Sequence, residues 1–178
     1  MKFLKILAII VAFLVVIFVV VGMLLPAQWE ISQSKVMAAS PLKIYRKVAN
    51  LKKWQEWSPW KDVEYGMIST YSGPEEGVGA QWNWVSKDMG NGNLHITKAD
   101  AAEGIVYQLI MDMNGSTSGL IGEFVFRELN GQTEVTWIDR GEGINFFERW
   151  KGFLIGLMMK KQMAYGLEQL NLQVSVEN

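Results

Sequence analysis

Residues 119–140, GLIGEFVFRELNGQTEVTWIDR, carry the clearest structural signal in this chain. Apolar and polar side chains alternate on both sides of Asn130-Gly131, which is typical of two half-buried strands. Both turn residues tolerate positive φ, so this pair is the preferred two-residue connection of an antiparallel hairpin. The residues expected on the apolar faces of this hairpin are Phe124, Phe126, Val135 and Trp137.

The same alternation recurs upstream of the hairpin, which indicates a larger sheet. Turn-forming residues separate the alternating runs, as at Gly73-Pro74 and Gly90-Asn91-Gly92. The predicted strands cover residues 29–37, 67–72, 80–86, 93–98, 105–113, 119–128 and 133–140.

Three helices are predicted in addition to an apolar run at the N-terminus. Ser40-Pro41 has the composition of a helix start, with the serine as the capping residue and the proline at the first helical position. We therefore expect one helix over residues 41–49 and a second over 51–57. From residue 146 onward the apolar spacing is helical, with a stripe formed by Trp150, Phe153, Leu154, Leu157 and Met158.

This order of elements predicts an α+β fold. Short connections make the strands after residue 67 an antiparallel run, and such a run forms one curved sheet with a single apolar face. The last helix is long enough to cover that face. The space between sheet and helix is either a filled core or an open cavity, which the alternation alone does not decide. The residues expected to line it are Trp82, Trp84, Tyr107, Leu109, Met111, Phe124, Phe126, Val135 and Trp137 on the sheet, and Leu154, Met158 and Tyr165 on the helix.

Residues 6–25 form an uninterrupted apolar run, preceded by Lys2 and Lys5. A helix of this length spans about 30 Å, which is the hydrocarbon thickness of a bilayer. A cleavable signal peptide has a shorter apolar stretch followed by a small-x-small site, and this run matches neither feature well. We expect an uncleaved single-pass anchor within residues 1–28, and Pro26 ends its helix. The two lysines place the N-terminus in the cytoplasm and the remaining residues outside the inner membrane, in the periplasm.

The composition of residues 29–178 predicts one domain with its own core. These residues carry 15 basic and 18 acidic side chains, a net charge of −3, without a basic stripe, so we expect no nucleic-acid partner. The chain has no cysteine and one histidine, which argues against a thiolate or catalytic metal site. We expect neither a metal nor a cofactor.

Catalytic signals are weak. His95 lies between two apolar residues and is expected to face away from their side of the sheet. Asp112 and Glu123 alternate with apolar rows and are expected in solvent. Asp139 shares its strand face with Trp137 and is the best candidate for a carboxyl group in the cavity, where burial would raise its pKa. No catalytic residue is assigned.

The tryptophans at positions 54, 57 and 60 have two interpretations. They form either an exposed platform for a partner or lipid headgroups, or the packed contact between the short helices and the long one. Tryptophan contributes most by burial, so we favour packing.

The run Leu51–Trp60, LKKWQEWSPW, resembles the tryptophan-rich signature of the polyketide cyclase/dehydrase and lipid-transport family, a branch of the START-like or Bet v 1-like superfamily. Tyr71–Ala80, YSGPEEGVGA, with the tryptophans at 82 and 84, resembles the next block of that family, and Gly166–Leu170 is similar to its closing helix. The resemblance covers about residues 29–174. It implies a helix-grip fold, in which a deep sheet wraps around a long C-terminal helix and a hydrophobic cavity lies between them. Bacterial members of the family often carry one N-terminal membrane span.

Three functions are compatible with the sequence. The first is a membrane-anchored domain that binds a hydrophobic small molecule or lipid. The second is a non-catalytic interaction domain with a membrane-protein partner and a solid core. The third is a cyclase or dehydratase, which needs polar groups that point into the cavity, and the superfamily includes all three kinds of protein.

Overall fold

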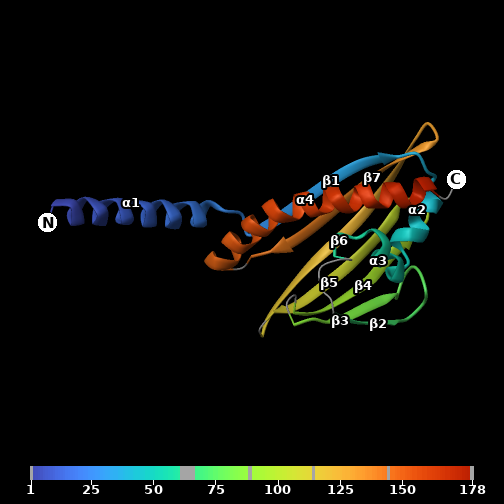
Figure 1. The fold of residues 1–178 in the computed structure, drawn as a ribbon, viewed down its shortest axis with the longest axis horizontal. Coiled ribbons are helices and arrows are strands. Elements are labelled where there is room, and N and C mark those ends of the chain that lie inside the picture. The colour runs from blue at the N-terminus through green and yellow to red at the C-terminus, as the bar shows by residue number, and fades with distance from the viewer. Residues whose placement is uncertain (1, 61–66, 88–89, 114, 144, 177–178) are drawn as a thin grey trace.

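The computed structural model describes residues 2–60, 67–87, 90–113, 115–143 and 145–176 (Figure 1). Its helices are α1 (Lys2–Leu24), α2 (Pro41–Val48), η1 (Leu51–Lys53), α3 (Trp54–Trp57) and α4 (Phe146–Val176). Its strands are β1 (Gln28–Met37), β2 (Ile68–Ser72), β3 (Gln81–Val85), β4 (Asn91–Asp100), β5 (Gly104–Met113), β6 (Ser116–Leu129) and β7 (Gln132–Glu142).

The seven strands form one antiparallel sheet in the order β1-β7-β6-β5-β4-β3-β2. Every predicted strand and helix is present, with ends that differ by a few residues. Asn130 and Gly131 have φ values of 50° and 84°, which confirms the predicted hairpin turn. The sheet curves around α4, and the α+β architecture predicted from the sequence is confirmed (Figure 1).

Two local predictions were wrong. Asn91 and Gly92 belong to strand β4 and do not form a turn. Gly92 pairs with Trp84, and a Cβ at position 92 would collide with the indole ring, so this glycine serves ring packing. Ser40 occupies the N-cap position of α2, but its hydroxyl makes no capping hydrogen bond. Pro41 at the start of the helix removes one of the N–H groups that would otherwise need a partner.

Side chains on the concave face of the sheet form rows across the strands, because paired residues stand side by side. The tyrosine row crosses five strands through Ile31, Asp139, Gly122, Tyr107 and Ile96. The neighbouring leucine row crosses all seven, through Trp29, Gly141, Leu120, Leu109, Leu94, Trp82 and Tyr71.

The short helices bury their tryptophans in the concave face, as the packing interpretation predicts. Trp54 and Trp57 are fully buried, and their indole N–H groups donate to the carbonyl oxygens of Val48 (2.8 Å) and Lys47 (3.2 Å). The Trp54 ring lies edge-on to Tyr107, Phe124 and Trp137 at centroid distances of 5.5–6.2 Å. This half of the concave face is a solid aromatic core.

Helix α4 lies along β1 and changes character halfway. Its second half buries Met163, Leu167, Leu170 and Val174 at helical spacing. In residues 146–161 only the two glycines, Gly152 and Gly156, are buried. They face Trp29 and Ile31 of β1, so the helix approaches the strand closely.

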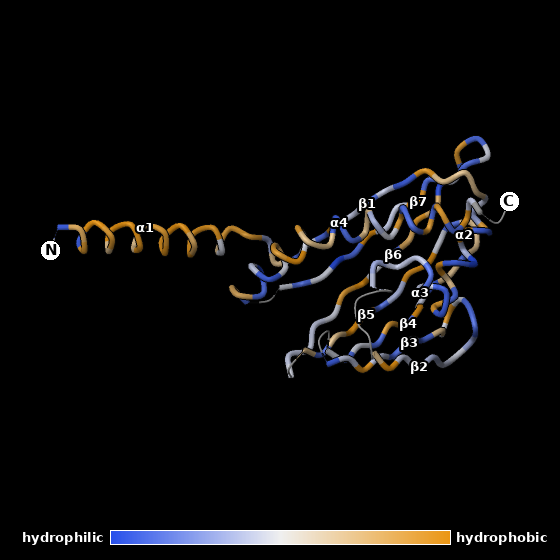
Figure 2. Tube along the Cα trace, in the orientation of Figure 1, coloured by the Kyte–Doolittle hydropathy of each residue, from blue (hydrophilic) through white to orange (hydrophobic). Residues whose placement is uncertain are grey.

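Helix α1 extends away from the sheet as a single rod (Figure 1). By length and composition it can cross a membrane, and its side chains are exposed along nearly the whole helix. Figure 2 shows the hydrophobic colour continuing along the rod. The same test is passed by signal sequences near an N-terminus.

Candidate functional site: a half-open apolar cavity

A cavity of about 1040 Å³ lies between the sheet and the first half of α4. Its floor is the middle of the leucine row, where Leu94, Leu109 and Leu120 stand side by side on β4, β5 and β6. Tyr107 and Trp54 form its inner end. Ligand pockets commonly measure about 300–1,000 Å³, so this volume reaches the upper end of that range.

The cavity stays open because the tryptophans of α3 pack over the other half of the concave face. Trp54 and Trp57 pack over Phe124 and Trp137, beyond the tyrosine row. Over this half, α4 contributes Gly152, Ile155 and Met159 to the lining, with Phe147 near the start of the helix. The interaction-domain alternative expects a filled interior, whereas the described residues leave this cavity between the sheet and α4.

The predicted cavity residues fall into three groups. Five of them line the cavity, four are buried in the core beside it, and three lie on the exposed side of α4. The lining residues are Trp82, Trp84, Tyr107, Leu109 and Met111. The core residues are Phe124, Phe126, Val135 and Trp137, and the exposed residues are Leu154, Met158 and Tyr165.

The helix residues were placed on the wrong side of α4. Leu154 and Met158 are 53% and 72% exposed, whereas Ile155 and Met159 line the cavity. The first half of α4 is apolar on nearly all sides, so the spacing of its apolar residues does not define which face meets the sheet.

Sequence reasoning missed several cavity residues. Trp29 follows the apolar run and was assigned only to a strand, although it pairs with Gly141 and packs against Gly152. Leu120 and Gly122 are two residues apart and share one face of the strand, so the alternation could have predicted that Leu120 lies on the cavity floor. The missed lining residues include Trp29, Leu94, Leu120, Phe147, Ile155 and Met159.

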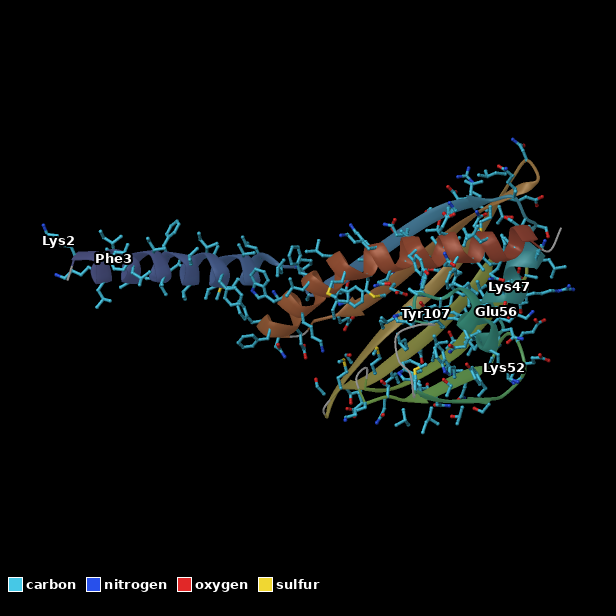
Figure 3. All side chains as sticks on the ribbon, in the orientation of Figure 1. Lys2, Phe3, Lys47, Lys52, Glu56 and Tyr107 are labelled. Carbon is cyan, nitrogen blue, oxygen red and sulfur yellow. The ribbon has the colours of Figure 1, made fainter. Side chains whose placement is uncertain are left out.

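A buried polar network forms the inner end of the cavity. The Tyr107 hydroxyl donates to the Asp139 carboxylate at 2.7 Å and accepts the indole N–H of Trp137 at 2.9 Å. Gly122 lies between Tyr107 and Asp139 on the intervening strand, and its missing side chain lets the tyrosine ring cross β6. Tyr107 lies between the sheet and α4 (Figure 3) and lines the cavity, whereas Asp139 lies behind it.

Asp139 is 1% exposed, and this burial raises its pKa from 3.8 to about 6. The hydrogen bond from the Tyr107 hydroxyl favours the charged form and opposes the shift. Burial, together with the neighbouring carboxylate, also raises the pKa of Tyr107, so its hydroxyl remains a donor at neutral pH. Sequence parity identified Asp139 as the candidate carboxyl group, and the structure places it in a perturbed environment.

Asp139→Asn is expected to stabilise the protein at pH 7.5 and to flatten its stability profile. A carboxyl group whose folded-state pKa is raised stabilises the fold below its unfolded pKa, and this contribution is lost as the pH rises through the folded value of about 6. The rise of the Asp139 pKa from 3.8 to about 6 corresponds to about 3 kcal/mol, so the gain in stability at pH 7.5 is expected to approach that size. Urea unfolding at pH 4 and 7.5 measures it, with exposed Asp112→Asn as the control. Equal effects of Asp139→Asn at both pH values would contradict the assignment.

The other titratable candidates lie outside the cavity. His95 is half-buried between the buried side chains of Leu94 and Ile96, so it points to the opposite face of the sheet. Asp112 is exposed, and Glu123 accepts a hydrogen bond from Arg140 at 2.8 Å on the convex face. None of the three lines the cavity.

Exposed lining residues of the cavity include residues 116–118 at the start of β6 and residues 145, 147 and 148 at the start of α4. Asn145 and Glu148 form a capping box there, in which the backbone N–H of each residue donates to the side chain of the other (3.1 and 3.0 Å). The start of α4 and the β5–β6 end of the sheet both lie at the end of the fold from which α1 emerges (Figure 1).

Comparison with known proteins yields similarity at the level of structure. Protein CV1439 from Chromobacterium violaceum superposes with a TM-score of 0.54 at 17% identity, over 82% of this chain and 96% of that one. Ara h 8.0201 superposes with a TM-score of 0.56 at 10% identity, over 85% of this chain and 99% of that one. DynU16, from the dynemicin biosynthetic locus, gives 0.56 at 10% identity, over 84% of this chain and 48% of that one. The domain has the Bet v 1-like helix-grip fold.

No family model and no curated protein matches the sequence. At these identities the structural likeness establishes the Bet v 1-like fold alone. A fold does not define a function, so the function has to be argued from the site. The cavity between sheet and helix is therefore the place in which to look for the activity.

Proposed function

We propose that this protein is a membrane-anchored binding protein that holds a hydrophobic small molecule or lipid between the sheet and α4. The apolar cavity of about 1040 Å³ carries the proposal. A ligand that buries about 400 Å² of apolar surface there gains about 10 kcal/mol of transfer free energy, before the cost of association. The Bet v 1-like fold and the resemblance of Leu51–Trp60 to a lipid-transport family support this function.

The division of the chain belongs to the same proposal. Residues 1–28 hold the domain at the inner membrane through a span at about 6–25, and residues 29–178 bind the ligand in the periplasm. The length and apolar composition of α1 support the span, and Lys2 and Lys5 support the orientation.

The anchor is tested by fractionation. The full chain is expected in the membrane pellet after alkaline carbonate washing, with an intact mass that includes residues 1–25, whereas a variant without residues 2–25 is expected in the soluble fraction. Because the chain has no cysteine, Leu172→Cys supplies one site for an impermeant maleimide, and we expect labelling in intact spheroplasts. A mature mass that lacks residues 1–25, or labelling only after lysis, would contradict the anchor or its orientation.

Binding is tested with residues 26–178 and diphenylhexatriene, a neutral apolar probe that fluoresces in apolar surroundings. We expect saturable binding with energy transfer from the cavity tryptophans, including Trp82 and Trp84. Probe emission that does not saturate, and that equals the emission with a protein that has no cavity, would contradict the proposed function.

A cyclase or dehydratase is the second candidate, because Tyr107 meets the cavity and Asp139 behind it has a raised pKa. A proton-transfer role requires turnover that depends on this pair. A bell-shaped pH–rate profile that Tyr107→Phe abolishes would favour the enzyme. Probe affinity unchanged in Tyr107→Phe, without detectable turnover in either protein, favours the binding protein.

A further inference from the structure

Aromatic rings pack the end of α1 against the start of α4. The Phe18 ring stacks on Trp150 at a centroid distance of 4.8 Å and lies edge-on to Phe146 at 5.5 Å. Gly22 is buried under the same two rings, and a side chain at this position would collide with them. The first turn of α4 is therefore held against the last turns of α1.

Arg149 strengthens this junction by capping α1. Its Nη1 donates to the carbonyl oxygens of Met23 (3.4 Å) and Leu25 (3.3 Å). The last carbonyl groups of a helix lack partners within the helix and carry its negative dipole end, so a guanidinium group is a favourable cap. With the two helices joined in this way, α4 runs away from α1 nearly along the direction of that helix (Figure 1).

This direction carries α4 out of the bilayer when α1 spans it. Phe146 contacts Phe18, which lies within residues 6–25, so α4 begins near the boundary between acyl chains and headgroups. Phe153 and Met158 lie seven and twelve residues after Phe146, which is about 10 and 18 Å further along the helix axis. These side chains therefore lie outside the acyl-chain layer, and lipid tails do not cover them.

The side of α4 that faces away from the sheet is apolar over these turns. A seam with spacings of three, four and three residues, as in a coiled coil, is formed by Phe147, Trp150, Leu154 and Leu157. By helical geometry this seam lies opposite Gly152, which faces β1. No charged residue occurs between positions 151 and 160. We define the apolar strip as the exposed apolar residues of this half of α4, namely Phe147, Phe153, Leu154, Leu157 and Met158.

The size and chemistry of the apolar strip fit a second copy of this chain. Side chains of this size present about 150–250 Å² each, so exposed fractions of 44–75% amount to roughly 500 Å² of apolar surface per copy. Two strips in contact would bury about 1,000 Å², the area at which a specific interface begins. Beside a two-fold axis each residue faces its own copy, so like charges would repel there, and the strip contains none. Lys161, the next residue at this spacing, ends the seam.

We infer that two anchored copies of this chain pair through their apolar strips, about a two-fold axis along the membrane normal. The inference rests on the proposed function, because it takes α1 to be the membrane span. Since α4 runs nearly along α1, rotation about such an axis brings the strips together and leaves both spans in the membrane with the same orientation. Ile155 and Met159 line the cavity from another side of α4, so pairing does not occupy the cavity.

Cross-linking of the full chain in its membrane tests the pairing, because the chain has no cysteine of its own. Leu154→Cys lies in the seam, 53% exposed, and Leu42→Cys on α2, 48% exposed, is the matched control for random collisions. After oxidation with copper phenanthroline, we expect several-fold more disulfide-linked dimer from position 154 than from position 42. A disulfide requires Cβ atoms about 3.5–4.5 Å apart, so equal yields, or no dimer at position 154, would overturn the inference.

A charge in the strip gives a second readout. Leu157→Asp added to Leu154→Cys is expected to lower the yield of linked dimer several-fold, because two like charges then face each other across the pair. Leu172→Asp added to Leu154→Cys is the control, since Leu172 is 48% exposed on the same helix beyond the strip, and we expect an unchanged yield. The same yield with either aspartate would contradict pairing through the strip.

The outcomes also separate this inference from the proposed function. Linked dimer at position 154 combined with no saturable probe binding by residues 26–178 keeps the pair and removes the ligand. Saturable probe binding combined with equal cross-linking at positions 154 and 42 keeps the ligand and overturns the pair. A chain that leaves the membrane on carbonate washing removes the anchor, and with it the two-fold arrangement.

Discussion

Gly122→Ala is expected to lower the free energy of unfolding by about 2–6 kcal/mol, a large loss for the addition of one methyl group. The new Cβ would lie within the Tyr107 ring, which crosses β6 at this glycine. The ring has to move, and overpacking of this kind costs about 1–3 kcal/mol. Displacement of the ring also removes the hydrogen bond from Tyr107 to the buried Asp139 carboxylate, which costs about 1–3 kcal/mol more.

Gly119→Ala is the matched control on the same strand. A Cβ at position 119 meets only the Leu109 carbonyl oxygen, at an ordinary distance of 3.6 Å. Alanine also loses less backbone entropy than glycine on folding into a strand, so the change in the free energy of unfolding is expected within about 1 kcal/mol of zero. Urea unfolding of both variants at pH 7.5 measures the difference. Similar urea midpoints for the two variants would show that the packing of Tyr107 does not require a glycine at position 122.

Leu109→Glu is expected to weaken the binding of diphenylhexatriene by about 30- to 100-fold, because a carboxylate on the cavity floor loses water when an apolar probe covers it, at a cost of about 2–3 kcal/mol. Leu109 is half-buried at the centre of the leucine row, so the variant loses little core packing. The probe carries no charge, which removes repulsion as an explanation. Titration of residues 26–178 with the probe, followed by tryptophan energy transfer, measures the affinity.

Val125→Glu is the control for that change. Val125 lies on β6 with its side chain on the convex face, 36% exposed, and it does not line the cavity. The same charge on the same sheet is expected to leave probe affinity within about twofold of the original protein, because no apolar probe covers it. Equal losses in both variants would mean that the probe binds elsewhere.

Local rules predicted the architecture because the chain obeys them in most places. Alternation located all seven strands, and Asn130-Gly131 identified the central hairpin. At Gly92 the rule failed because packing of an aromatic ring requires the glycine. Gly92 has the composition of a turn but lies in a strand under the Trp84 ring.

The cavity was only partly predictable. Period-two alternation placed Tyr107, Leu109 and Met111 on one face, and all three line the cavity. The same rule cannot separate a lining residue from a core residue, since Phe124 and Trp137 share that face and are covered by the tryptophans of α3. Which part of the face stays open depends on where Trp54 and Trp57 settle, and that is a property of tertiary packing.

The first half of α4 shows a related limit. Its residues are apolar toward the cavity and apolar on the opposite side, so no periodic signal gives its orientation. Contacts with Phe18 and Gly22 of α1 and the glycines that face β1 orient the helix instead. Those contacts join segments more than 100 residues apart, which a local pattern does not register.

The proposed function requires an apolar molecule in the cavity of the protein as it exists in its membrane. The most direct measurement is native mass spectrometry of the full chain purified from its own membrane, together with solvent extraction of the same sample. One apolar species is expected to accompany the protein at close to one molecule per chain, and to be depleted in Leu109→Glu but retained in Val125→Glu. A protein that carries no such species, or carries it equally in both variants, would contradict the account.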